Sequence, residues 1–227
     1  MRRVRIVDAA IVNPGRPKFS EITFIDTASN QFALPYAAFS FLRILDLMAL
    51  SATIYVFAVR LANADRGVYE ELTLRVARHP SETEEYLLTR LLAYCIEYRE
   101  GLTFSSGLSS PDEPAIAERD LTGALQTWID VGAPEAARLH KASKAARRVV
   151  VYAHRNVDTW LARLQGERIH RVEDLELYVI PPDLLAALVK HLERRMDFEL
   201  TVSDGTLYIS FQDETLSGAI EARQVAK

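Results

Sequence analysis

The sequence has little cysteine and no long uncharged apolar run, which argues against a disulfide-stabilised protein and against a membrane-spanning one. Cys95 is the single cysteine among 227 residues, which excludes an internal disulfide and a CxxC metal site and suits a reducing compartment. The most apolar stretch, residues 32–59, is interrupted by Arg43 and Asp46, so it does not predict a membrane span. The basic N-terminus lacks the short apolar segment of a secretory signal, and we expect a cytoplasmic protein.

A strong excess of one sign of charge is also missing. The formal net charge is -4, which argues against a protein that coats nucleic acid through its whole surface, so any phosphate binding needs a local basic patch. The five histidines occur in no HExxH motif, the serines occur in no GxSxG motif, and there is no P-loop or GxGxxG. The sequence therefore gives no ground for a zinc site, a serine hydrolase or a nucleotide cofactor.

The chain divides at about residue 47. Residues 1–47 mix turn formers with short apolar pieces and keep no helical or strand period, so we treat them as an N-terminal extension. That extension is either a weakly ordered arm or an over-extended reading frame with Met48 as the true start. With 49% hydrophobic residues, the rest of the chain predicts one domain over 48–227.

Apolar periodicity predicts an α/β (mixed α+β) domain, with a central mixed β-sheet flanked by helices and additional β-hairpins. Ser81 and Glu84 have the spacing of a capping box, and Asp204-Gly205 is the preferred pair for a type I′ turn. We expect strands at 52–63, 69–78, 102–105, 115–119, 125–131, 148–154, 175–180, 198–202 and 207–211, and helices at 81–100, 135–147, 157–165 and 182–194.

Acidic residues occur at the joints in the middle of the chain. A tight turn at 120–123 predicts a hairpin in which Glu113 lies directly opposite Asp130, with Cβ atoms about 5 Å apart. Two carboxylates at that distance repel unless a cation or a proton lies between them, and Mg²⁺ prefers oxygen ligands. Asp112 could complete such a site. From the preceding helix Glu85 is better placed to reach it than Glu82, which points further toward solvent on a helical wheel. Acids in a first helical turn are also favoured by the helix dipole alone.

The predicted helix after Asp130 carries basic residues from Arg138 to Arg148 with no acid between them. Arg138, Lys141, Lys144 and Arg148 share one flank of the predicted helix and its end. This flank is a candidate for binding nucleic-acid phosphate, and one lysine of it could face the carboxylates. The alternative is a solvated face whose cations are favoured near a helix C-terminus by the dipole.

Several segments, in the same order, resemble the markers of the YaeQ family over about residues 48–222. They are RHPSET at 78–83, DEP at 112–114, DLTG at 120–123, WIDVG at 128–132 and HKA at 140–142. That family is similar in fold to the PD-(D/E)XK nucleases, so the resemblance implies a restriction-endonuclease-like core. It also implies that Glu85 (or Glu82), Asp112 or Glu113, and Asp130 hold Mg²⁺ while a lysine assists the attacking water.

Two positions depart from the superfamily pattern. Gly132 stands where the pattern has its lysine, a role that could pass to Lys141, and Ala115 follows Pro114 where the pattern has an acid. Two functions therefore remain open. One is a Mg²⁺-dependent nuclease, which is a hydrolase of phosphodiesters; the other is a nuclease-fold module without catalysis that binds nucleic acid or a protein partner.

Overall fold

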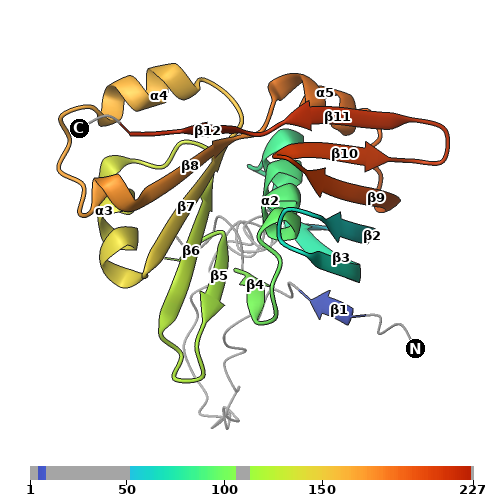
Figure 1. Ribbon diagram of the computed structural model, residues 1–227, viewed down its shortest axis with the longest axis horizontal. Coiled ribbons are helices and arrows are strands. Elements are labelled where there is room, and N and C mark those ends of the chain that lie inside the picture. Colours follow the sequence, from blue (N-terminus) through green and yellow to red (C-terminus); the bar gives the residue numbers. More distant parts are fainter. Residues whose placement is uncertain (1–4, 9–51, 106–112, 226–227) are drawn as a thin grey trace, which may run out of the picture.

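The computed structural model describes residues 5–8, 52–105 and 113–225, which form two mixed β-sheets and the helices around them (Figure 1). The expected α/β class with a mixed sheet flanked by helices is confirmed. The expectations for residues 1–47 and for Asp112 lie outside the described residues, apart from Arg5–Asp8.

The first sheet has six strands and contains two hairpins, over residues 53–78 and 195–210. Its order is β1 (Arg5–Asp8), β3 (Val68–Arg78), β2 (Thr53–Asn63), β9 (Arg195–Ser203), β10 (Thr206–Ser210) and β11 (Thr215–Ala219). Strands β2 and β3 are antiparallel, and β2 runs parallel to β9. Asp204 and Gly205 have φ values of 49° and 68°, as the predicted type I′ turn between β9 and β10 requires.

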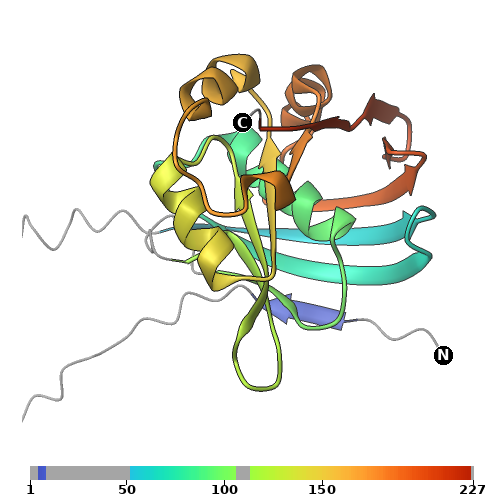
Figure 2. The ribbon, with the colours of Figure 1, turned by 60° about the vertical axis from the view of Figure 1, so that its left-hand side comes forward.

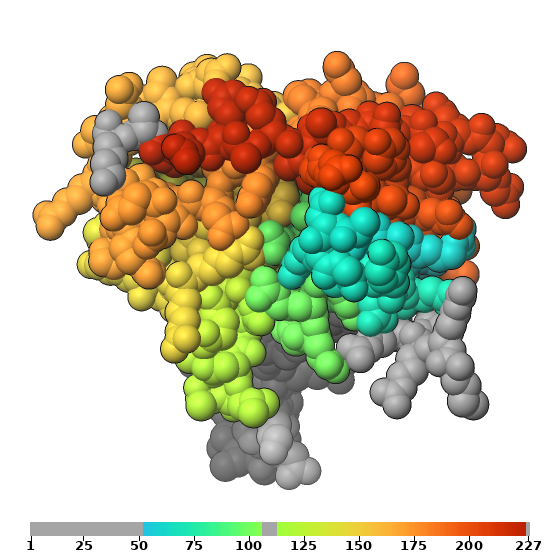
Figure 3. Space-filling model, in the orientation of Figure 1, coloured from blue at the N-terminus to red at the C-terminus, as the bar shows by residue number. Residues whose placement is uncertain are grey.

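The second sheet also has six strands, and its parallel part positions the site described below. Its order is β12 (Glu221–Arg223), β8 (Leu175–Val179), β7 (Arg148–Ala153), β6 (Leu125–Val131), β5 (Ile116–Arg119) and β4 (Leu102–Phe104). Strands β6, β7 and β8 are parallel, so the carboxyl ends of β6 and β7 meet at one edge. The last segment of the chain crosses from β11 to β12 and so joins the two sheets (Figures 1 and 3).

Four α-helices in the described chain cover the sheets. They are α2 (Glu84–Ile96), α3 (Ala136–Ala145), α4 (Val157–Leu164) and α5 (Pro182–Val189). Helix α2 lies between the two sheets, whereas α3 and α4 pack on the opposite face of the second sheet (Figures 1 and 2). The second sheet is thus covered on both faces, and this is why β7 is a continuous apolar run buried from Val149 to Ala153.

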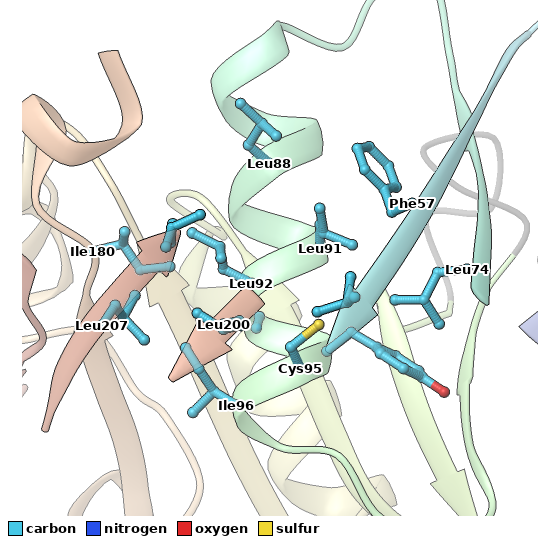
Figure 4. Packing of buried hydrophobic residues seen from close by; sticks show 14 of the residues in the cluster. Phe57, Leu74, Leu88, Leu91, Leu92, Cys95, Ile96, Ile180, Leu200 and Leu207 are labelled. Carbon is cyan, nitrogen blue, oxygen red and sulfur yellow. The ribbon is translucent and has the colours of Figure 1, made fainter. Parts of the chain in front are cut away.

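The main core forms around α2. Leu91 and Cys95 of this helix face Phe57 and Leu74 of the first hairpin, and Ile180 approaches from the other side (Figure 4). Cys95 is fully buried, and burial raises the pKa of its thiol to about 12. Cys95 is therefore an apolar packing residue of this core rather than a reactive thiol.

The boundaries of α2 and α5 differ from the predicted ones. The helix is capped by Thr83, whose Oγ1 accepts from the Tyr86 N–H at 3.2 Å, while Ser81 bonds instead to Nδ1 of His79. The predicted capping box at Ser81 is therefore wrong, and α2 ends at Ile96 rather than near residue 100. Helix α5 likewise ends at Val189, before the predicted 194.

The predicted hairpin register is also wrong. Ile116 pairs with Ile129, and a bulge between Glu118 and Arg119 shifts the pairing near the turn. The carboxylate of Asp120 accepts from the N–H of Ala124 at 3.0 Å, which holds a wider turn than the two-residue one expected. Continuing this register places Ala115, not Glu113, opposite Asp130.

Among the described residues, no helix is both long enough and apolar enough to cross a membrane.

Candidate functional site

A cleft of about 530 Å³ opens at the carboxyl ends of β6 and β7. Helix α2 contributes to one wall, and α3, α4 and the segments that follow the two strands contribute to the others. Its charged lining consists of four arginines and two carboxylates: Arg90, Arg138, Arg155, Arg163, Glu113 and Asp130. Glu113 and Asp130, two of the residues that the sequence predicts for the site, therefore share one cleft.

Asp130 is held by Arg138. The Asp130 side chain is 3% exposed, and its two oxygens accept from Nε and Nη2 of Arg138, each at 2.7 Å. The same Nη2 donates to the backbone oxygen of Glu113 at 2.7 Å. The guanidinium also lies 5.6 Å from the centre of the Trp128 ring. A bidentate pair of this kind fixes both partners, so Arg138 joins β6, α3 and the segment before β5.

A second arginine–carboxylate pair is formed by Arg90, which lines the cleft, and Glu82. Nη2 of Arg90 donates to Oε2 of Glu82 at 3.1 Å and to the backbone oxygen of Ala77 at 2.6 Å. The other oxygen of Glu82, Oε1, is buried without a hydrogen-bond partner in the described chain. Burial raises the pKa of Glu82, while Arg90 acts in the opposite direction. The acid that precedes α2 is therefore inside the protein, not on the solvent side that the sequence predicts.

Tyr86 stands where these two pairs approach each other. Burial raises its pKa to about 12, and Arg90, Glu82 and Asp130 all act on it. A Cβ added to Gly132 would lie 3.7 Å from the Tyr86 ring, and Gly132 has a φ of +90°. A lysine at Gly132 would need a backbone conformation that side chains rarely adopt, which explains physically why this position carries glycine.

His154 closes the cleft at the end of β7. It is 5% exposed, and neither ring nitrogen has a hydrogen-bond partner among the described residues. Burial lowers its pKa, and the positive charge of Arg155 lowers it further, whereas Glu85 raises it. The imidazole is therefore neutral at pH 7, and His154 lines the cleft with both ring nitrogens buried and unsatisfied within the described chain.

Among the other predicted site residues, Glu85 and Lys141 are not part of the cleft lining. Glu85 is half-buried in the first turn of α2, where its own N–H and Thr83 lower its pKa, with a smaller contribution from Arg155. Lys141 is exposed on α3. Asp112 lies in the stretch that the structure does not describe.

The predicted basic flank does not form one band. Arg138 is engaged by Asp130, as described above. Arg148 opens β7 and binds Glu97 and Glu176 at the junction of the two sheets, with its Nη1 at 2.7 Å from Glu97. Lys141 and Lys144 remain as exposed residues of α3. The expectation that all four share one flank is wrong because Arg148 belongs to a strand and has its own carboxylate partners.

One signal in the sequence could have identified two of the residues that were missed. His154 and Arg155 follow directly after a buried strand and before a helix. Residues at the carboxyl ends of parallel strands are where ligands bind in many sheets of this kind. Arg90 and Arg163 carry no comparable local signal, because only the packing of their helices brings them to the cleft.

Comparison with known proteins agrees with the fold and with the sequence markers. The family model "YaeQ protein" matches residues 48–220. A protein named "Uncharacterized protein YaeQ" from Salmonella typhi is 34% identical over 165 residues, covering 72% of this chain and 91% of its own. The protein of the same name from Escherichia coli strain K12 is 32% identical over 179 residues, which cover 78% of this chain and 98% of its own.

Two crystal structures of YaeQ proteins are similar to this structure. The one from Xanthomonas axonopodis pv. citri has a TM-score of 0.71 at 31% identity and covers 78% of this chain and all of its own. The one from Pseudomonas syringae has a TM-score of 0.68 at 33% identity, and the match covers 75% of this chain and 95% of its own. The chain belongs to the YaeQ family.

Proposed function

We propose that the cleft at the ends of β6 and β7 binds the phosphate backbone of a nucleic acid. The observation that carries this proposal is the pair Arg155 and Arg163. Both are exposed, both line the cleft, and neither makes a hydrogen bond or ion pair within the described part of the chain. Guanidinium groups bind phosphate oxygens in a planar, bidentate manner.

The charge of the whole chain supports a local site of this kind. A protein with a net charge of -4 does not attract a polyanion through its general surface. Phosphate binding must then come from arginines gathered in one place, as they are in this cleft. Arg138 adds to the positive lining but is mostly compensated by Asp130.

Magnesium fits the described residues in kind but not in their arrangement. Glu82, Glu113 and Asp130 are oxygen ligands of the type that Mg²⁺ prefers. No three metal-ligating side chains form a group in the part of the chain that the structure describes. Arg138 already occupies both oxygens of Asp130, so an ion would have to displace the guanidinium.

Metal-dependent cleavage of the bound strand is nevertheless a second candidate function. One observation favours it, namely the buried Oε1 of Glu82 that has no partner among the described residues. In that case Glu82 or Glu85, Asp112 or Glu113, and Asp130 would hold the ion, with Lys141 assisting. The ion would supply Lewis-acid polarisation of a phosphoryl oxygen and a more acidic bound water.

Binding is tested with the full chain and fluorescent DNA and RNA oligonucleotides by anisotropy across a range of salt concentrations. We expect affinity to fall steeply with salt, and Arg163→Ala to reduce the slope of log K against log salt by about 0.7 to 0.9. Lys190→Ala is the matched control, since Lys190 is exposed at the end of α5 and does not line the cleft. Absence of binding at low salt, or equal losses in both variants, would overturn the proposal.

Cleavage is tested in the same samples with and without Mg²⁺ or Mn²⁺. Products that require the metal and vanish in Asp130→Asn, while anisotropy still reports binding, would support the second candidate. Intact oligonucleotides with every metal tried would remove it and leave binding as the function. Circular dichroism of Asp130→Asn controls for loss of fold.

A further inference from the structure

We infer that the N-terminal end of α4, together with His154, Arg155 and Arg163, forms a subsite for a single phosphate group. This inference rests on the proposed function and names the part of the cleft that holds the anion. The ligand class is a phosphate, either an internal phosphodiester of a strand or a terminal phosphate.

The start of α4 offers backbone donors to the cleft. The first hydrogen bond of the helix runs from the N–H of Trp160 to the oxygen of Asn156 at 2.9 Å. The N–H groups of residues 157–159 come before it, and the Asn156 side chain does not cap them. Asn156 and Thr159 both line the cleft. N–H groups at a helix N-terminus, reinforced by the dipole, attract anions.

His154 is the independent observation that points to a ligand. A buried imidazole with two unsatisfied nitrogens destabilises a folded protein unless something binds it. His154 lines the same cleft as Asn156 and Thr159 at the start of α4. Whichever nitrogen carries the proton can donate to an oxyanion, because a neutral imidazole always has one N–H.

The charged neighbours favour an anion at this end of the cleft. Thr159 and Arg163 are four residues apart, so they lie on the same face of α4, and Arg155 stands just before the helix. Two acids are close. Asp158 is paired with Arg223 of β12 at 2.5 Å and is not part of the lining, and Glu85 lies near enough to Arg155 for its pKa to be lowered.

The first test is a titration of the isotope-labelled full chain with inorganic phosphate, followed by amide and imidazole NMR at low ionic strength. We expect saturable shifts at the amides of residues 157–159 and at the His154 ring, with the pKa of His154 rising as phosphate binds. Arg163→Ala should weaken the affinity at least fivefold, whereas Lys190→Ala should leave it unchanged. Amides of 157–159 that do not move at saturating phosphate would overturn the subsite.

The variant His154→Leu separates a ligand-binding role from a structural one. Removing two unsatisfied nitrogens should leave the unfolding temperature unchanged or raise it, while phosphate affinity falls. A histidine kept only for packing would give a lower unfolding temperature and an unchanged affinity, and that result would count against the subsite.

Oligonucleotide binding distinguishes a terminal phosphate from an internal phosphodiester. It also distinguishes failure of the subsite from failure of the proposed function. Tighter binding of a 5′-phosphorylated strand than of its 5′-hydroxyl counterpart assigns the subsite to a terminal phosphate, and equal binding assigns it to an internal phosphodiester. Salt-dependent oligonucleotide binding without shifts in α4 would refute the subsite but keep the proposed function. No binding of either ligand would refute both.

Discussion

Two cavities of similar size differ in whether their charged and polar side chains have hydrogen-bond partners. The cavity at the junction of the two sheets, about 470 Å³, contains Glu97, which is 5% exposed. Oε2 and Oε1 of Glu97 accept from Arg148 at 2.7 and 3.0 Å, and Oε1 also accepts from the hydroxyl of Tyr152 at 3.0 Å. The cleft at the ends of β6 and β7 instead leaves His154, Arg155 and Arg163 without hydrogen-bond partners in the described chain.

The difference distinguishes a structural site, at the junction, from the proposed binding site in the cleft. A buried carboxylate whose two oxygens are both satisfied holds the elements that supply its partners, in this case α2 and β7. Groups left unsatisfied in a cleft weaken the fold and gain their partners only when a ligand binds. Substitutions at the junction should therefore lower stability, and substitutions at the cleft should lower binding.

The largest effect on stability is expected at Glu97. Glu97→Gln leaves Arg148 without its buried counter-charge and should lower the free energy of unfolding by about 3 kcal/mol. Glu176→Gln removes the other partner of Arg148, but the Glu176 side chain is 35% exposed, so a loss below about 1 kcal/mol is expected. Urea denaturation measures both. Equal losses of unfolding free energy in the two variants would contradict the contrast between buried Glu97 and the more exposed Glu176.

A smaller effect is expected at Gly132. Gly132→Ala forces a side chain into a φ near +90° and should lower stability by about 2 kcal/mol. Gly101→Ala is the matched control, since Gly101 has a φ of +89° and open space around it. The two variants should be equally destabilised in thermal melts. Only Gly132→Ala, which adds an atom beside Tyr86 in the cleft, should also change oligonucleotide affinity.

Acid should weaken the junction. Burial opposes ionisation of Glu97, but hydrogen bonds from Arg148 outweigh it and hold the pKa of Glu97 below its ordinary value of 4.5. Ionised Glu97 therefore contributes its full share to the free energy of unfolding above pH 4.5, and this contribution is lost as the pH falls through the lowered pKa. The difference in unfolding free energy between wild type and Glu97→Gln should therefore shrink below pH 4.5. A difference that stays constant from pH 6 to pH 3 would contradict this assignment.

The sequence predicted elements better than it predicted the site, and the reasons are local. Strands β2 and β3 and helix α2 carry strong apolar periods, so they were found close to their true positions. The contact expected between Glu113 and Asp130 depended on a hairpin register, and the Asp120 turn with its bulge changed it. Helical-wheel reasoning placed Glu82 toward solvent, but Glu82 precedes α2 and is buried against Arg90.

The cleft itself depends on packing that no single segment encodes. Arg138 reaches Asp130 from the next helix, a contact that the charge pattern allowed but did not specify. Arg163 reaches the cleft only because α4 packs across the ends of the parallel strands.

The most direct test is a crystal structure of the full chain with a short oligonucleotide. We expect phosphate oxygens within hydrogen-bond distance of Arg155, Arg163 and the first N–H groups of α4, with the His154 ring donating to one of them. A strand that lies along Lys141 and Lys144 on the exposed face of α3, with the cleft free of phosphate, would contradict the assignment of the binding site.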